Sequence, residues 1–157
     1  MGKSKPKNLS KSKIILILLA VLLIVLVIFF KLKKIHYPSK VKLNINNQNY
    51  FLEIASTPGQ REFGLSNRES ICTNCGMLFI FPKVATRNFW MKDTFIPLDI
   101  IWLDKKFKIT KIATVLETNS QKTYSSKAKY VIELNANEVF KHDLKVGDTI
   151  QLPDFND

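Results

Sequence analysis

The sequence lacks the motifs on which several large enzyme classes depend. Its 157 residues include only five glycines, and none of them builds a glycine-rich loop that could cradle a phosphate. No serine lies in a nucleophile elbow, and the serine, histidine and carboxylate residues do not show the spacing of a hydrolase triad. The usual signatures of nucleotide binding and of serine hydrolysis are therefore absent.

Residues that bind metals are equally scarce. The chain has two cysteines, Cys72 and Cys75, and two histidines, His36 and His142, which are far apart in sequence. A structural zinc site takes four ligands, so zinc binding would need residues from a second chain. We expect no metal and no cofactor.

Acidic residues are missing from the first 34 positions. This segment holds eight lysines, whereas the other 123 residues carry 16 basic and 13 acidic side chains, a net charge of +3. Most of the overall charge of +11 is thus a basic flank suited to anionic lipid headgroups. We expect no nucleic-acid partner, because the excess charge lies beside an apolar segment.

That segment is an unbroken apolar run over residues 14–30, with lysines on both sides. As a helix it would be roughly 25 Å long, and flanking lysines could snorkel to cover the rest of a bilayer core of about 30 Å. The small residues of a signal-peptide cleavage site do not follow it. We therefore predict an uncleaved transmembrane helix at 14–30 that binds the lipid bilayer.

The organisation predicted around this helix is simple. A basic tail covers residues 1–13, a juxtamembrane linker covers 31–40, and one domain covers 41–153. Lysines are equally numerous on the two sides of the span, but a short basic tail favours a cytoplasmic N-terminus, and a long domain is translocated largely regardless of charge. We predict a single-pass membrane protein whose C-terminal domain lies outside the cytoplasm.

The domain is predicted to be mostly β (α+β), a small barrel or a sandwich with one or two short helices. Thr57 and Gln60 have the spacing of a capping box that starts a helix, Pro58 suits the first helical position, and Gly64 can end the helix. A second short helix is expected over 137–144. The expected strands cover residues 41–45, 50–55, 77–81, 88–91, 98–103, 107–116, 129–134 and 149–152.

Several motifs occur in an order that resembles a known family. They are Thr57…Gln60-Arg61…Gly64-Leu65…Arg68, Gly76-Met77-Leu78-Phe79…Phe81, Phe89-Trp90-Met91-Lys92-Asp93-Thr94, Ile96-Pro97-Leu98-Asp99-Ile100, Tyr130-Val131-Ile132-Glu133-Leu134-Asn135 and Gly147-Asp148. Over about Val41 to Leu152 they are similar to the domain-of-unknown-function 192 family. The resemblance implies a compact β-rich domain, often exported or anchored, with no established activity.

The chain departs from the pattern of that family at three positions. Ser66 stands where methionine is usual, Asp93 where asparagine is commoner, and Asn137 where glycine is often found. An asparagine cannot take a proton, so the resemblance argues against an essential general base at position 93.

The stretch from Trp90 to Asp99 is the best candidate for recognition or chemistry, because it combines aromatic, cationic, acidic and hydroxyl side chains. The alternative is structural, with Trp90 and Phe95 in the core and Asp93 and Thr94 in a turn. The candidate ligand-binding residues are Arg68, Trp90, Lys92, Asp93, Thr94, Asp99 and Glu133.

Arginine and acid residues outside that stretch have the same two interpretations. Arg68 could bind a carboxylate or phosphate of a ligand, or it could pair with Asp99, Glu62 or Glu133 within the protein. Asp99 and Glu133 lie in apolar strands, so we expect them to be partly buried and paired.

Cys72 and Cys75 precede the Gly-Met-Leu-Phe strand. A local disulfide is the plainest expectation outside the cytoplasm. Thiol–disulfide exchange and a zinc site shared between chains stay open as alternatives.

Together these features predict a membrane-anchored binding or envelope-associated module whose ligand is a small molecule, a glycan or a protein. Two alternatives remain. One is an enzyme that uses Asp93 or Asp99 with Lys92 or Arg68 in a cleft, and the other is a thiol redox protein that uses Cys72 and Cys75.

Overall fold

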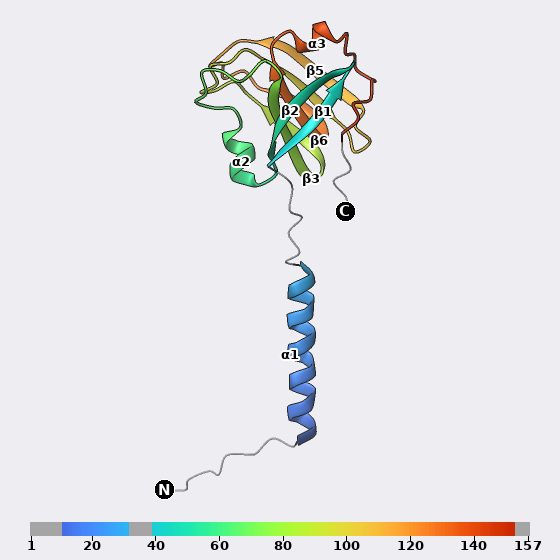
Figure 1. Ribbon diagram of the computed structural model, residues 1–157. Coiled ribbons are helices and arrows are strands. Elements are labelled where there is room, and N and C mark those ends of the chain that lie inside the picture. Colours follow the sequence, from blue (N-terminus) through green and yellow to red (C-terminus); the bar gives the residue numbers. More distant parts are fainter. Residues whose placement is uncertain (1–10, 32–38, 153–157) are drawn as a thin grey trace, which may run out of the picture. The chain divides into compact units, whose positions relative to one another are not determined.

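The computed structural model describes residues 11–31 and 39–152, which fall into two units (Figure 1). In the first unit a single helix, α1, covers Lys11–Lys31 and includes the predicted helical residues 14–30. No helix among the described residues has both the length and the apolar character needed to cross a membrane. The tail residues 1–10 and the linker residues 32–38 lie outside the described residues.

The second unit contains a six-stranded mixed sheet and two short helices (Figure 1). The strands are β1 (Lys40–Ile45), β2 (Gln48–Ala55), β3 (Cys75–Phe89), β4 (Leu98–Leu103), β5 (Ile109–Leu116) and β6 (Tyr124–Asn135). They are ordered β1-β2-β3-β6-β4-β5, and only the β2–β3 pair is parallel. Helix α2 (Pro58–Phe63) lies in the connection between these two parallel strands.

The first hairpin follows directly from its turn residues. Asn46 and Asn47 have positive φ angles of 46° and 65°, which asparagine tolerates better than most residues and which suit a two-residue hairpin turn. β1 and β2 therefore pair in register from Lys40 with Glu53 to Ile45 with Gln48.

Apolar side chains cover both faces of the sheet. Every residue of β4 is buried, and neighbouring residues of β4 and β6 alternate between two apolar clusters, as the period of a strand requires. One cluster includes Ile101 and Ile132, and the other includes Trp102 and Val131. Burial of β4 on both faces explains why five of its six residues are apolar.

The predicted barrel was wrong, since the sheet is open. Among the described residues, the edge strands β1 and β5 do not pair with each other. The strands predicted at 77–81 and 88–91 are two parts of the single strand β3, with a register shift between Ile80 and Ala85. The strand predicted at 149–152 is reduced to one bridge between Lys108 and Thr149.

The second predicted helix is present but short. Helix α3 covers Glu138–Lys141, and Asn137 precedes it with a positive φ of 75°, a conformation that explains why glycine is common there. The Tyr50 hydroxyl donates to the Glu138 carboxylate and lies 2.6 Å from Nε2 of His142. These buried contacts hold α3 against β2.

Candidate functional site

The first wall of the candidate site is α2 with the residues that follow it. The expected capping box is confirmed: the Thr57 hydroxyl accepts from the Gln60 amide, and the Gln60 side chain accepts from the Thr57 amide at 3.0 Å. Gly64 then ends the helix with a φ of 53°, and a Cβ at this position would lie 3.4 Å from the Phe79 ring. The glycine thus lets the loop turn closely over the aromatic face of β3.

The second wall is the loop between β3 and β4, which is fixed at several points by backbone hydrogen bonds. The Asn67 amide donates to the Asp93 carbonyl at 2.7 Å and so joins this loop to the residues after α2. The Met91 amide donates to the Ser120 carbonyl, and the Asn119 amide donates to the Thr94 carbonyl. The loop is therefore joined on one side to the first wall and on the other to the connection between β5 and β6.

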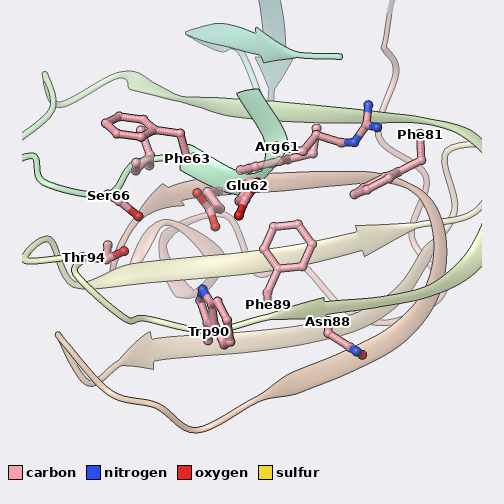
Figure 2. A pocket seen from close by; sticks show the side chains of 13 residues that line it. Arg61, Glu62, Phe63, Ser66, Phe81, Asn88, Phe89, Trp90 and Thr94 are labelled. Carbon is pink, nitrogen blue, oxygen red and sulfur yellow. The ribbon is translucent and has the colours of Figure 1, made fainter. Parts of the chain in front are cut away.

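Between these walls lies a cavity of about 210 Å³, which we call the Glu133 cavity. Figure 2 shows side chains from α2, β3 and the following loop around it. Its lining residues are Arg61, Glu62, Phe63, Gly64, Leu65, Ser66, Phe79, Phe81, Asn88, Phe89, Trp90, Thr94 and Glu133. The lining thus combines aromatic walls with a few polar groups, as is typical of small-molecule sites.

Glu133 is the unusual polar group of this cavity. The residue is 5% exposed, and its Oε2 atom is buried with no hydrogen-bond partner among the residues that the structure describes. Burial raises the pKa of the carboxyl from 4.5 to about 8, so the group carries a proton at neutral pH. The sequence predicted that Glu133 is partly buried and paired: the burial is confirmed and is nearly complete, whereas no ion pair of Glu133 is found in the described part of the chain.

Trp90 and Phe95 are not core residues, so the structural interpretation of these two side chains was wrong. Trp90 is 55% exposed and Phe95 is 50% exposed. Trp90 instead contributes to the rim of the Glu133 cavity, where Figure 2 shows it below Phe89. An exposed tryptophan beside a buried polar group offers a large contact surface for a ligand.

Lys92 and Asp93 lie in a second cavity of about 350 Å³, which shares Glu62, Phe63, Ser66 and Trp90 with the first. Both side chains are exposed. Asp93 has a φ of 54°, a conformation that asparagine and aspartate tolerate. This backbone conformation explains why asparagine is commoner at position 93 in the family that the chain resembles and why this chain can have aspartate there. Thr94 is buried and lines the Glu133 cavity, where its hydroxyl donates to the Lys92 carbonyl at 3.3 Å.

Asp99 is fully buried, and its carboxylate accepts hydrogen bonds from two backbone amides. Its Oδ1 accepts from the Val115 amide at 2.8 Å, and its Oδ2 accepts from the Val139 amide at 2.9 Å. The carboxylate therefore joins β4 to β5 and to the start of α3, with both oxygens occupied.

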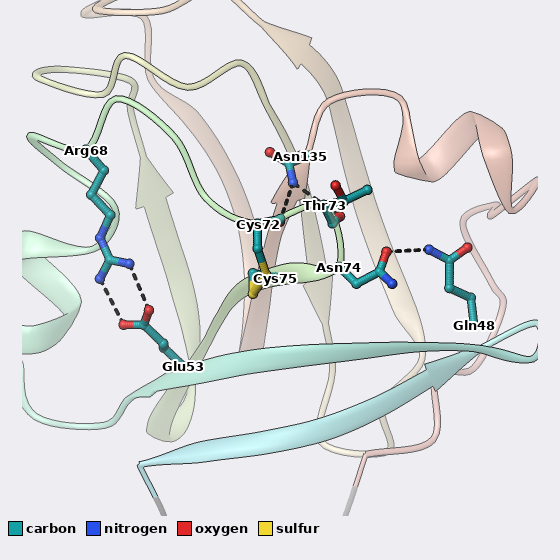
Figure 3. Close-up of a disulfide and its surroundings, with 8 residues drawn as sticks. All are labelled: Gln48, Glu53, Arg68, Cys72, Thr73, Asn74, Cys75 and Asn135. Atoms are coloured by element: carbon teal, nitrogen blue, oxygen red, sulfur yellow. Dashed lines mark hydrogen bonds and ion pairs between the residues drawn. A yellow bond between two sulfur atoms is a disulfide. The ribbon is translucent and has the colours of Figure 1, made fainter.

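Arg68 forms a two-pronged ion pair with Glu53, both N–O distances being 2.8 Å (Figure 3). The bond to Arg68 holds the pKa of Glu53 below its usual value. An internal pair was one of the two predicted roles, but the three partners proposed for it were wrong. The pair fastens the loop after α2 to β2 and leaves Arg68 beside a neighbouring cavity around Phe63 and Gly64.

Cys72 and Cys75 form the predicted disulfide (Figure 3). The Cys75 amide donates to the Cys72 carbonyl at 3.0 Å, and the Asn135 side chain donates to the same carbonyl at 3.0 Å. The bridge and these hydrogen bonds fix the chain where it enters β3.

Several residues of the Glu133 cavity were missing from the sequence-based set. Three of them, Phe79, Phe81 and Phe89, lie on β3. Phe79 and Phe81 are two positions apart, which is the period of a strand, and Phe89 follows the irregular part of β3. This alternation was the available signal. Phe63 belongs to a helix too short for a periodic pattern.

Comparison with known proteins identifies the family but no activity. The profile of the domain-of-unknown-function 192 family, described as an uncharacterized ACR, matches residues 41–152. A comparison with curated proteins found no match.

Two solved structures are similar to this chain. One is a protein of Sinorhizobium meliloti described as a "putative transcription regulator", with 31% identity, a TM-score of 0.66, and coverage of 71% of this chain and 91% of that one. The other, a protein of unknown function from Novosphingobium aromaticivorans, has 24% identity, a TM-score of 0.64, and coverage of 72% and 84%. The chain belongs to the domain-of-unknown-function 192 family.

Proposed function

We propose that this chain is a membrane-anchored binding module, and that the Glu133 cavity holds a small ligand. One observation carries the proposal: Glu133 has a buried oxygen without a partner beside a cavity with an exposed tryptophan on its rim. Leaving a buried polar atom unpaired costs about 1–3 kcal/mol. A ligand that hydrogen bonds to Glu133 would recover this free energy, while Trp90 and Phe89 contact its apolar part.

Phenol is a suitable first probe, because it combines an aromatic ring with one hydroxyl group. With the full chain in non-ionic detergent, phenol should shift the indole N–H resonance of Trp90 and leave that of the buried Trp102 unchanged. Trp90→Ala should weaken phenol binding at least tenfold, a loss of about 1.4 kcal/mol. Its free energy of unfolding should change by less than about 1 kcal/mol, because the side chain is exposed.

Phe95→Ala is the matched control. Phe95 is equally exposed but lines neither cavity, so this variant should bind phenol normally. Equal binding by the native chain and both variants would contradict the proposal.

The location outside the cytoplasm and the anchor are supported by separate features. The run at 14–30 lies between lysines, and the large apolar side chains described between Ile15 and Leu23 in α1 are exposed. The Cys72–Cys75 disulfide suits an oxidising compartment.

Thiol labelling tests this location. In membranes prepared with the thiols protected from exchange, a maleimide should label Cys72 and Cys75 only after a reductant is added. Labelling without reductant would place the domain in a reducing compartment. A mixed disulfide trapped by Cys75→Ser, but not by Cys72→Ser, would favour the redox alternative, in which Cys72 is the exposed attacking thiol.

A second function, acid catalysis, is favoured by the protonated state of Glu133. The sequence also suggested an enzyme in which Asp93 or Asp99 acts with Lys92 or Arg68. This hypothesis has little support, because Asp99 and Arg68 already have partners inside the protein. Glu133, with a pKa of about 8, could donate a proton at neutral pH, and Glu62 lies on the same cavity. A measured pKa near 4.5 for Glu133 would contradict acid catalysis by this residue.

A further inference from the structure

Two arginines share one aromatic ring at the edge of the Glu133 cavity. The guanidinium carbon of Arg61 lies 5.0 Å from the centroid of the Phe81 ring, and that of Arg87 lies 3.9 Å from the same centroid. Arg61, Phe81 and Asn88, the residue after Arg87, line the cavity. In Figure 2, the Arg61 guanidinium extends toward Phe81 on the side away from Thr94. We call Arg61 and Arg87 the arginine pair.

Neither guanidinium of this pair is neutralised by an acid in the part of the chain that the structure describes. Arg61 donates to the carbonyls of Ser56 and Ile80, and Arg87 donates to the carbonyl of Lys83 at 2.6 Å. The Nε atom of Arg87 is buried and has no partner. Arg68, by contrast, is fully paired with a carboxylate.

The surroundings of the two guanidinium groups disfavour their charged forms. Burial lowers the pKa of both arginines, and the positive charge of Arg61 lowers that of Arg87 further. Two like charges held close together favour the binding of an anion, which removes their repulsion. Guanidinium groups match the oxygens of carboxylates and phosphates especially well.

The rest of the cavity suits an anion with an organic body. Glu133 is uncharged at neutral pH and can donate its O–H to an oxygen of the ligand. The rings of Phe89 and Trp90 line the same cavity and offer apolar contact to the organic body. Glu62, the remaining carboxylate of the lining, is exposed to solvent, which screens its charge.

We propose that the Glu133 cavity binds a small organic oxyanion, whose carboxylate or phosphate group contacts the arginine pair and whose apolar body lies against Phe89 and Trp90. The inference rests on the proposed binding function and narrows it to one class of ligand. The features that favour this class are two cationic groups beside Phe81, aromatic rings in the lining and a carboxylic acid that can donate a hydrogen bond.

Three probes of the same shape and different charge test the proposal: benzoate, benzamide and benzylamine. They are titrated into the full chain in non-ionic detergent at neutral pH, and the indole resonance of Trp90 is followed. Benzoate should bind at least ten times more tightly than neutral benzamide, and cationic benzylamine should bind most weakly. Equal affinities for benzoate and benzamide would overturn the anion inference but leave the proposed binding function intact.

Arg87→Gln is the decisive variant, since Arg61 also supports the backbone around α2. It should weaken benzoate binding at least tenfold and leave benzamide binding unchanged. Arg87→Lys keeps the charge but loses the planar fork, so its benzoate affinity should be intermediate. Arg68→Gln is the matched control, because the charge of Arg68 is already neutralised by Glu53, and it should bind benzoate normally.

Inorganic phosphate separates the anionic group from the organic body. It should compete with benzoate only weakly, because it makes no contact with the aromatic rings. Phosphate binding as tight as that of benzoate would overturn the role of Phe89 and Trp90 in recognition. Loss of benzoate binding in Arg68→Gln, with no loss in Arg87→Gln, would overturn the assignment to the arginine pair.

Discussion

Relative to a Glu133→Gln variant, the native chain is expected to lose stability as the pH rises from about 4.5 to about 8. The pKa of Glu133 is about 8 in the folded chain and near 4.5 when the carboxyl is in water. Between these values the folded chain holds a proton that the unfolded chain has lost. Raising the pH therefore favours unfolding, by up to about 1.4 kcal/mol per pH unit.

Urea unfolding at a series of pH values measures this effect, with the fluorescence of the buried Trp102 as the signal. The difference between the native chain and Glu133→Gln should vary with pH only inside that window, and it should become constant above it. The amide of glutamine does not titrate, so every other titrating group cancels in the difference.

Glu62→Gln is the control, because Glu62 lies on the same cavity but is exposed. This variant should keep the pH dependence of the native chain. If the native and Glu133→Gln curves run parallel, the Glu133 carboxyl is solvated and the main support for a ligand site there is lost. An organic oxyanion bound in the cavity should also raise the stability of the native chain by mass action.

The sequence predicted best those elements that are encoded by neighbouring residues. The capping box of α2 and the strand at 98–103 depend on local signals, and both are confirmed. The strands expected at 41–45 and 50–55 are also present, but the second begins earlier, at Gln48, because the turn consists of Asn46 and Asn47 alone. Whether strands close into a barrel depends instead on contacts between strands far apart in sequence. Alternation of apolar residues along each strand carries no information on that point.

Long-range partners account for the errors at individual residues. Glu53 lies 15 positions before Arg68, and the amides that bind Asp99 lie 16 and 40 positions away. The sequence left Trp90 with two interpretations, a ligand-binding residue or a core residue, because tryptophan is usually buried to a large degree. The structure excludes the core position, since Trp90 follows the last residue of β3 and lies at the cavity rim. The burial of Glu133 was predicted because a carboxylate within an apolar strand is rare, and the structure confirms that burial.

The second large expected effect is the loss of stability when Asp99 is replaced. It tests whether this acid has a structural role or a catalytic one. Asp99→Ala should lower the free energy of unfolding by about 3 kcal/mol or more, since it removes two hydrogen bonds to a carboxylate and leaves the buried Val139 amide without this acceptor. Val115, which donates one of them, has a φ of 48°, a strained conformation for a β-branched residue. Without the hydrogen bond to Asp99, Val115 should leave this conformation.

Two asparagine variants complete the test. Asp99→Asn keeps one acceptor oxygen and should lose roughly half as much stability, whereas Asp93→Asn should change it by less than about 0.5 kcal/mol, because Asp93 is exposed and asparagine tolerates its backbone. Folded Asp99→Asn should bind phenol as the native chain does, because Asp99 serves β5 and α3 and its side chain does not line the Glu133 cavity. A stable Asp99→Asn protein that does not bind phenol would contradict the purely structural role and would show that Asp99 contributes to binding.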